Sequence, residues 1–208
     1  MKQEARSERS RTQILAAALR LFSSQGYRGT NMREIAEAAG VSTGNVYHQF
    51  KDKEALFQTL LEEYVNIQKS PDYPFNRALT DGYFPNDLEK FGAAIRESLV
   101  QTRAHAMLFY IDVIEFNGKH LRQFYVNVNE RFEAYLASER GRECEKWLRP
   151  GISPLAAMQF TTRSLSRYFE TEVLFGVTDA YGRDAADVIK ELTDFITLVE
   201  NIDRAPRA

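Results

Sequence analysis

Apolar side chains recur at the spacing of amphipathic helices along most of this chain of 208 residues. Up to residue 69 the pattern predicts helices at about 10–26, 31–40, 42–49 and 52–69. Beyond residue 86 it predicts helices at about 87–104, 105–116, 119–147, 153–175 and 184–202. The sequence has no strand-like alternation of apolar and polar residues and no internal repeat. The predicted fold class is therefore all-α.

Two stretches interrupt the helical pattern. Residues 2–9 are polar, and we expect a frayed tail before a helix capped by Ser10; its arginines either reach the backbone phosphates of a partner or have no function. In residues 70–86 three prolines and a glycine exclude a long helix, whereas four aromatic residues are too many for a solvated linker. We expect an ordered loop packed on the core there, with a pocket lid as the alternative.

The segment 30–53 carries the signals of two short helices joined by a tight turn. Asn31 and Glu34 have the spacing of a capping box, so a helix should begin there. Gly40 can adopt a positive φ and end that helix, and Ser42 can cap the next one. This is the pattern of a helix-turn-helix.

The second helix of this pair has few apolar side chains to bury and many polar side chains to expose. Val46 is its only aliphatic residue, and the residues around it are small or carry amide, hydroxyl or imidazole groups. Asn and Gln pair with adenine, Thr contacts a thymine methyl or a phosphate, and Gly allows close backbone approach. The helix therefore suits the major groove of DNA, and a surface hairpin with a polar outer face is the alternative.

The DNA-binding signature of the TetR/AcrR family of bacterial regulators resembles the string from Ile35 to Leu56, I-A-x-x-A-G-V-S-x-G-x-V-Y-x-x-F-x-x-K-E-x-L. The resemblance covers about the first third of the chain. It implies a three-helix DNA-binding head in residues 1–53, with the helix-turn-helix at about 31–50. It also implies a helical ligand-binding and dimerisation body in residues 54–208.

In that family the last two helices form a four-helix dimer interface. Here they correspond to about 153–175 and 184–202, and the alternative is that they are core helices of a monomer. Dimerisation also has a physical motive, because one small head makes few base contacts and two heads read half-sites about 34 Å apart.

The side-chain chemistry and the resemblance together define an expected DNA-contacting set. We expect Thr43, Asn45 and Gln49 to contact base edges or thymine methyls, with Gly44 permitting close approach. The residues expected to hold phosphates are Thr30, Ser42, Tyr47, His48 and Lys53. One departure from the family stands out, because the His that usually precedes the final Phe is replaced by Gln49, and His48 lies about 100° around the helix.

Positive charge is concentrated at the N-terminal end of the chain. The net charge is −2, and residues 1–53 hold nine Lys and Arg against five acids, a balance of +4 that leaves −6 for the remainder. A basic head on an acidic body fits a protein that docks one end on DNA. The second helix has no Arg or Lys, so the charge at this surface should come from its edges. The edge residues are Arg28, Arg33, Lys51 and Lys53.

The resemblance implies a ligand cavity among the aromatic middle helices of the body. Asp112 and Glu115 interrupt an apolar run, and a buried carboxylate needs a partner. That partner is either a cationic ligand or an ion pair with Arg163, Arg167 or His105, and the remaining alternative is that the carboxylates lie on a solvated edge. Aromatic stripes are more often core than pocket. The expected pocket residues are Phe91, Phe109, Asp112, Phe116, Tyr125, Phe132, Phe160 and Tyr168.

No catalytic motif is visible in the sequence. HExxH, CxxC, GxSxG, Walker and GxGxxG patterns are absent, and we expect no enzyme, cofactor or metal. Basic neighbours make Cys144 either a reactive thiolate or an inert thiol. One cysteine, no apolar run of membrane length and no apolar signal region favour the cytoplasm.

These features predict a homodimeric transcriptional repressor that binds a palindromic double-stranded DNA operator. An unidentified small-molecule effector would release it. The alternatives are a helical ligand-binding or adaptor protein without specific DNA binding, and a small helical enzyme.

Overall fold

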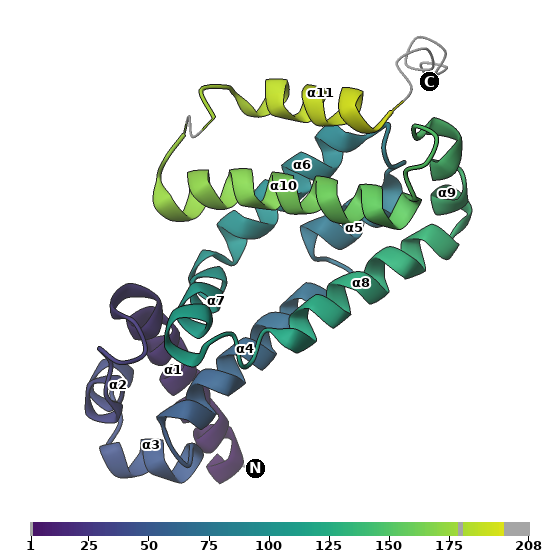
Figure 1. Ribbon diagram of the computed structural model, residues 1–208. Helices are drawn as coiled ribbons and strands as arrows, with labels where there is room; N and C mark the ends of the chain where they lie inside the picture. The colour runs from purple at the N-terminus through teal and green to yellow at the C-terminus, as the bar shows by residue number, and fades with distance from the viewer. Residues whose placement is uncertain (1, 179–180, 198–208) are drawn as a thin grey trace. The chain divides into compact units, whose positions relative to one another are not determined.

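The computed structural model describes residues 2–178 and 181–197 (Figure 1). Within these ranges the secondary structure is helical, with one isolated bridge between Leu148 and Thr197 and no strand, which confirms the all-α prediction. None of the helices in this part has the length and apolar character of a membrane span. The elements are α1 (Lys2–Gln25), α2 (Met32–Ala39), α3 (Thr43–Gln49), α4 (Lys53–Lys69), α5 (Pro74–Asp81), α6 (Leu88–Gln101), α7 (Arg103–Phe116), α8 (Arg122–Ala137), α9 (Glu139–Arg142), the 3-10 helix η1 (Cys144–Trp147), α10 (Pro154–Phe175) and α11 (Ala185–Ile196).

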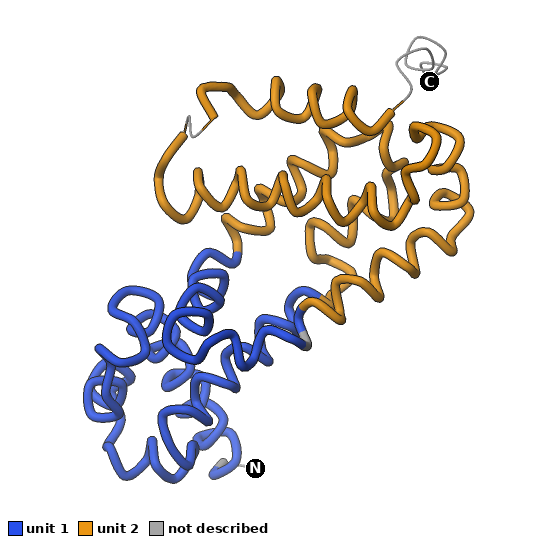
Figure 2. The backbone as a smooth tube through the Cα atoms, viewed as in Figure 1, with its two compact units in different colours: residues 1–68, 102–124 blue, residues 69–101, 125–208 orange. Residues whose placement is uncertain are grey.

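The chain folds into two compact units (Figure 2). Unit 1 contains residues 1–68 and 102–124, and unit 2 contains residues 69–101 and 125–208. Unit 1 is larger than the predicted head of residues 1–53, because most of α4 and all of α7 belong to the same compact unit. The assignment of DNA binding to residues 1–53 stays a prediction about function.

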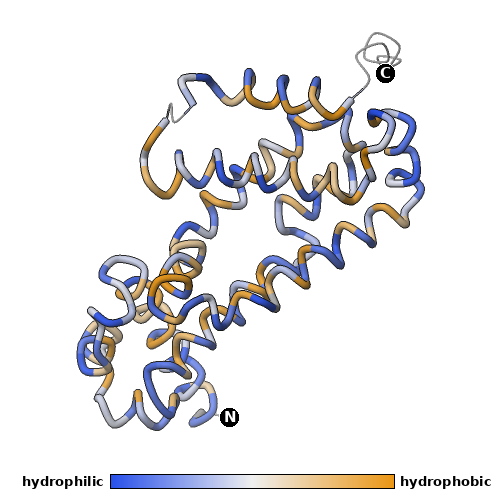
Figure 3. Tube along the Cα trace, in the orientation of Figure 1, coloured by the Kyte–Doolittle hydropathy of each residue, from blue (hydrophilic) through white to orange (hydrophobic). Residues whose placement is uncertain are grey.

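Unit 1 is built around the apolar stripe of α1. Ile14, Ala18 and Phe22 are fully buried at intervals of four residues, in one cluster with apolar side chains of α2, α3, α4 and α7. Ala36 and Ala39 of α2 are also buried, and their small side chains let α1 approach closely. Both hydrophobic and hydrophilic residues occur along the long helices in Figure 3.

Unit 2 is centred on α6, which packs against α5, α10 and α11. Phe91 is fully buried, and its ring lies 6.1 Å from the ring of Phe84 and 6.2 Å from that of Phe75. Gly92 permits close approach of α11, because a Cβ there would lie 2.8 Å from Ile189 Cδ1. Helix α6 therefore supports both helices that are predicted to form the dimer interface.

The N-terminal helix is longer than predicted. It begins at Lys2, so residues 2–9 are helical and the predicted frayed tail is wrong. The predicted cap at Ser10 is wrong as well, because Ser10 lies inside α1. Helix α1 extends toward the N-terminus beyond its apolar stripe. Apolar periodicity could not predict this extension, because its residues are almost all polar.

Two other boundaries differ from the prediction. The segment 70–86 contains the short helix α5, with Pro74 in its first turn, where the missing N–H removes no helical hydrogen bond. The predicted helix 119–147 is divided into α8, α9 and η1. The chain folds back tightly at this division. The close approach is shown by Gly141, where a Cβ would lie 2.1 Å from the Tyr135 carbonyl oxygen.

The two helices predicted for the dimer interface begin at the predicted caps. The Ser153 hydroxyl accepts the N–H of Ala156 at 3.2 Å at the start of α10. The Asp184 carboxylate accepts the N–H of Asp187 at 2.9 Å at the start of α11. The predicted end of the second helix, 198–202, lies outside the described residues.

Candidate nucleic-acid interface

Helices α2 and α3 form the helix-turn-helix with the predicted capping. Asn31 Oδ1 accepts the N–H groups of Arg33 and Glu34 at 3.1 and 3.0 Å, and Glu34 Oε2 accepts the N–H of Asn31 at 3.1 Å. Gly40 ends α2 with φ at 67°, in the left-handed region. The Ser42 hydroxyl accepts the N–H of Asn45 at 3.2 Å and caps α3. The predicted capping box and turn are confirmed.

Helix α3 is anchored by one side chain and exposes most of the others. Val46 is its only buried residue, and Phe50 is buried just after its end. Tyr47 is 55% exposed. Asn45 and Gln49 are half-buried. The other predicted DNA contacts that lie exposed are Arg33, Ser42, Thr43, Gly44 and His48.

Thr30 is placed inside the structure rather than on this surface. It is 1% exposed, and its hydroxyl donates to the Gly26 carbonyl at 2.8 Å. The same hydroxyl accepts a hydrogen bond from Gln25 Nε2 at 3.3 Å. Contrary to the expectation that it faces a phosphate, the Thr30 side chain stabilises the turn between α1 and α2.

Lys53 is also directed inward. Its Nζ donates to the carbonyl oxygens of Tyr27 and Thr30, each at 2.7 Å, and lies 4.2 Å from the centre of the Tyr27 ring. Desolvation lowers the pKa of Lys53, and the charges of Glu115 and Glu34 partly oppose that shift. Two of the three ammonium donors are therefore used within unit 1, and the expected role of Lys53 as a phosphate ligand stays a prediction that rests on the third donor.

Glu115 holds the other side of the same turn. Its Oε1 accepts the N–H of Tyr27 at 2.9 Å, and its Oε2 accepts the N–H of Arg28 at 2.8 Å. The Arg28 guanidinium adds an ion pair at 3.7 Å. The suggested partners for Glu115, a cationic ligand or an ion pair with Arg163, Arg167 or His105, are not the ones observed. Helix α7 thus binds the N–H groups of the turn, while α4 binds its carbonyl groups.

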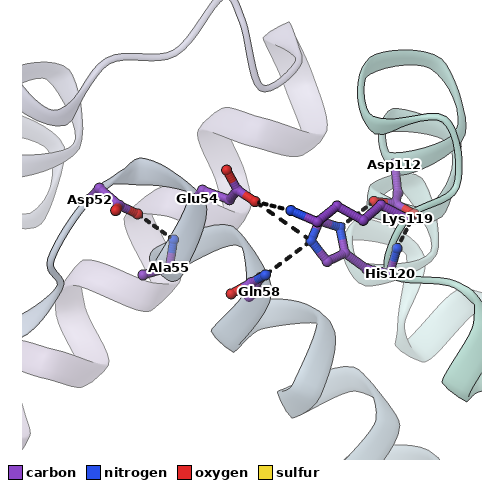
Figure 4. Close-up of polar contacts among 7 residues, drawn as sticks. All are labelled: Asp52, Glu54, Ala55, Gln58, Asp112, Lys119 and His120. Carbon is purple, nitrogen blue, oxygen red and sulfur yellow. Dashed lines mark hydrogen bonds and ion pairs between the residues drawn. The ribbon is translucent and has the colours of Figure 1, made fainter.

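Asp112 is paired with His120 (Figure 4). It is fully buried, its Oδ1 lies 2.5 Å from His120 Nδ1, and its Oδ2 accepts the His120 backbone N–H at 3.1 Å. On the other side of the ring, His120 Nε2 lies 3.1 Å from Gln58 Nε2. A ring that donates through Nδ1 and accepts at Nε2 satisfies both neighbours. The prediction that Asp112 lines a ligand pocket is therefore corrected, because both oxygens face His120.

The remaining predicted pocket residues do not surround one described cavity. In unit 1, the Phe116 ring lies 4.6 Å from Tyr27 and the Phe109 ring lies 4.4 Å from Phe124, so both belong to aromatic clusters. In unit 2, Phe91, Phe132 and Tyr168 are buried in the core. Tyr125 is 48% exposed and Phe160 is 72% exposed. An aromatic side chain can be buried in a core or exposed at a surface. The sequence therefore could not distinguish the buried residues of this set from the exposed ones.

Cys144 is a buried thiol. It is fully buried, and desolvation, with the charge of Glu145 adding to it, raises the pKa of the thiol to about 12. Of the two alternatives, this environment favours the inert thiol over the reactive thiolate. In residues 2–178 and 181–197 no group of three or more His, Cys, Asp or Glu is placed to hold a metal ion.

The placement of residues 2–9 on a helix beside α3 was not predicted, although contact of their arginines with the DNA backbone was one of the alternatives considered. The first two turns of α1 lie beside α3, and Gln49 Nε2 donates to the Ser7 hydroxyl at 2.8 Å. A hollow of about 640 Å³ lies between the two helices and is lined by residues of both. The sequence signal for this surface was the helical spacing of the polar residues before Ser10. Because these residues are polar, we interpreted them as a solvated tail.

Helix α3 exposes most of its side chains, is held by a capped turn and is braced by α1. This arrangement is that of helix-turn-helix DNA-binding proteins.

Residues 14–60 match the sequence model of the family described as bacterial regulatory proteins, tetR family. The HTH-type transcriptional regulator AcrR of Shigella flexneri is 52% identical over 61 residues, which are 29% of this chain and 27% of that protein. The HTH-type transcriptional repressor AcnR of Corynebacterium glutamicum is 46% identical over 54 residues, 26% of this chain and 29% of that protein. These matches therefore span under a third of the relatives' length.

Solved structures extend the likeness in fold over most of the chain. NalD, described as the secondary repressor of the MexAB-OprM multidrug efflux pump in Pseudomonas aeruginosa, has a TM-score of 0.60 at 24% identity and covers 93% of this chain and 98% of its own. SmeT, solved as a complex with triclosan, has a TM-score of 0.64 at 19% identity, covering 91% of this chain and 92% of its own. Residues 14–60 therefore match the DNA-binding domain of the tetR family, and the likeness of the rest of the chain to the solved structures is one of fold.

Proposed function

We propose that this chain is a homodimeric transcriptional repressor that reads a palindromic DNA operator through α3. The observation that carries the proposal is the burial pattern of α3, in which Val46 alone is buried and the other side chains are exposed or half-buried. A helix with so little core contact contributes little to folding. Presentation of its side chains to a major groove accounts for that arrangement.

The proposed base-reading residues are Thr43, Asn45 and Gln49. Thr43 and Gly44 are exposed in the first turn of α3, the end that recognition helices direct at base edges. Asn45 and Gln49 offer amide groups that pair with adenine. The proposed phosphate contacts are Arg33, Ser42, Tyr47 and His48, which are all exposed.

The proposed dimer forms through α10 and α11. Phe160 on α10 is 72% exposed and Phe195 on α11 is 70% exposed, whereas most phenylalanines of unit 2 are buried. Large exposed aromatic side chains on adjacent helices are typical of a protein interface. A symmetric pair would bury the same residues from both copies.

The proposed effector is a small molecule that binds the body and favours a dimer whose heads do not fit the operator. Its effect is limited by the difference between its affinities for the two states. The SmeT complex with triclosan and the repressor names among the relatives support this mode of control. Such a protein acts in the cytoplasm, where its DNA lies.

A selection experiment tests the DNA-binding proposal. The purified protein is incubated with random-sequence duplexes in the presence of excess bulk DNA, and bound duplexes are enriched over several rounds. A regulator enriches one palindromic sequence, whereas an adaptor protein without specific DNA binding enriches none. Asn45→Ala should weaken the selected site by about 1–3 kcal/mol, and unchanged affinity would remove Asn45 from the base-reading set.

The dimer proposal is tested by sedimentation of charged variants. Phe160→Glu and Phe195→Glu should shift the protein toward the monomer, because each buries a charge in the proposed interface. Val126→Glu is the matched control, since Val126 is 42% exposed on α8, outside that interface. Equal sedimentation of all three variants would place the interface elsewhere.

A further inference from the structure

A polar hollow of about 640 Å³ lies beside α3 within unit 1. Its α1 wall consists of Gln3, Arg6, Ser7 and Ser10. Its α3 wall consists of Asn45, His48 and Gln49. Every one of these side chains has a hydrogen-bond donor, none is acidic and none is apolar. A wall of this composition is suited to the oxygens of an anion.

The α1 wall continues the face of the helix that forms the core. From Gln3 to Ser10 the residues at i, i+3, i+4 and i+7 are polar, and from Ile14 to Ala18 the same face is apolar and buried. The inward face of α1 therefore changes from apolar to polar where the helix passes the core and reaches α3. Residues 3–9 are exposed, so the polar groups on this face remain accessible to a ligand.

One direct contact ties this extension to the reading helix. Gln49 Nε2 donates to the Ser7 hydroxyl at 2.8 Å and approaches the Ser7 carbonyl oxygen at 3.4 Å. The contact fixes the orientation of an amide that is proposed to read a base. The α1 extension thus belongs to the same surface as α3.

The distribution of charge around α3 is compatible with an anion in this hollow. Helix α3 contains no Arg or Lys. The Lys53 ammonium is bound to two carbonyl groups, whereas Arg28, Arg33 and Lys51 are exposed at other edges of the surface. Arg6 lines a hollow that contains no acid. It is placed to add a positive charge directly beside α3.

We propose that the hollow binds a backbone phosphate of DNA, with Arg6 supplying the charge and the hydroxyl groups of Ser7 and Ser10 donating to its oxygens. This inference rests on the proposed function and enlarges its interface from α3 to the first two turns of α1. Ser7 has a second role as a positioning residue, because it orients Gln49.

Arg6→Ala tests the proposal, with Arg9→Ala as the matched control. Arg9 is an exposed arginine of the same helix that does not line the hollow, so both variants remove one charge from the same segment. The probe is the duplex enriched by the wild-type protein. Arg6→Ala should weaken binding about tenfold and lower the slope of log affinity against log salt by about one. Arg9→Ala should change affinity less than about threefold.

Phosphate ethylation locates the contact on the DNA. With wild-type protein, ethylation of one particular phosphate in each half-site should block binding, and with Arg6→Ala that phosphate should lose its effect. Equal losses for the two arginine variants, or an unchanged ethylation pattern, would overturn the proposal. Failure of the proposed function would be seen earlier, as the absence of any duplex enriched by the wild-type protein.

Discussion

Glu115 accepts the backbone N–H of Tyr27 at 2.9 Å, joining the end of α7 to the turn before the helix-turn-helix. The second carboxylate oxygen accepts the N–H of Arg28. On the opposite side of the turn, Lys53 donates to two carbonyl groups. The α1–α2 turn is therefore held from both sides by residues that lie outside the helix-turn-helix itself.

Glu115→Gln should destabilise unit 1 by about 1–3 kcal/mol, because one N–H of the turn then faces an amide NH₂ instead of an acceptor. Urea unfolding measures the loss. Glu97→Gln is the control, since Glu97 pairs with Arg77 on the surface of unit 2, where about half of each side chain is exposed. A loss no larger than that of the control would show that the turn does not depend on Glu115.

Lys53→Met separates a positioning role from a phosphate contact. The variant keeps the aliphatic stem and removes the ammonium, so the Tyr27 and Thr30 carbonyl groups lose their donor. We expect lower stability by about 1–3 kcal/mol and an unchanged salt slope of DNA binding. Lys51→Met, at an exposed neighbour, should leave the stability within about 0.5 kcal/mol of the wild type. A salt slope reduced by about one in Lys53→Met would restore Lys53 to the phosphate-binding set.

The pair of Asp112 and His120 is suited to a double-mutant cycle. Asp112→Asn, His120→Gln and the double variant should give a coupling energy of about 1–3 kcal/mol, because the 2.5 Å contact is buried and both carboxylate oxygens are used. Chemical unfolding of the four proteins provides the measurement. Additive losses would mean that the two side chains contribute independently, and the pairing would then be incidental to stability.

His105 should make unit 1 less stable in acid. Desolvation lowers its pKa below the ordinary value of 6.5, with Glu63 partly opposing, and within the described residues its Nε2 has no hydrogen-bond partner. Below pH 6.5 the unfolded chain therefore binds a proton that the folded chain does not, so stability is complete above that pH and falls as the pH decreases toward the lowered pKa. The loss is about 1.4 kcal/mol for each unit by which the pKa is lowered.

Urea unfolding at pH 7.5 and pH 5.5 measures this effect. The difference between the two pH values should shrink in His105→Gln and persist in His48→Gln, since His48 is exposed on α3. An equal difference in wild type and His105→Gln would assign the acid sensitivity to other groups.

Local chemistry made much of the DNA-binding head predictable. Asn31, Glu34, Gly40 and Ser42 act through hydrogen bonds and backbone angles within a few residues of themselves, and the structure contains each of these caps. The burial of Val46 followed from its isolation among polar residues. Periodicity likewise located most helices of the body, because an apolar stripe needs only its own helix to be recognised.

The roles of charged residues were decided by the tertiary structure. Lys53 and Glu115 meet the α1–α2 turn across 26 and 88 positions of sequence, and no local pattern specifies such partners. Asp112 was correctly recognised as a carboxylate in need of a partner, but His120 was not among the partners considered. The residues before Ser10 were misread for the same reason, since their polar face has meaning only beside α3.

The amino-acid sequence by itself thus determined the helical class, the helix-turn-helix with its caps, and the chemistry presented by α3. These depend on interactions between residues that are close in the chain. Only the tertiary structure decided which polar side chains face inward, namely Thr30, Lys53, Asp112 and Glu115, and that the extension of α1 borders α3. Those outcomes depend on distant contacts, where a charged group is stabilised by whichever partner the fold places within hydrogen-bonding distance.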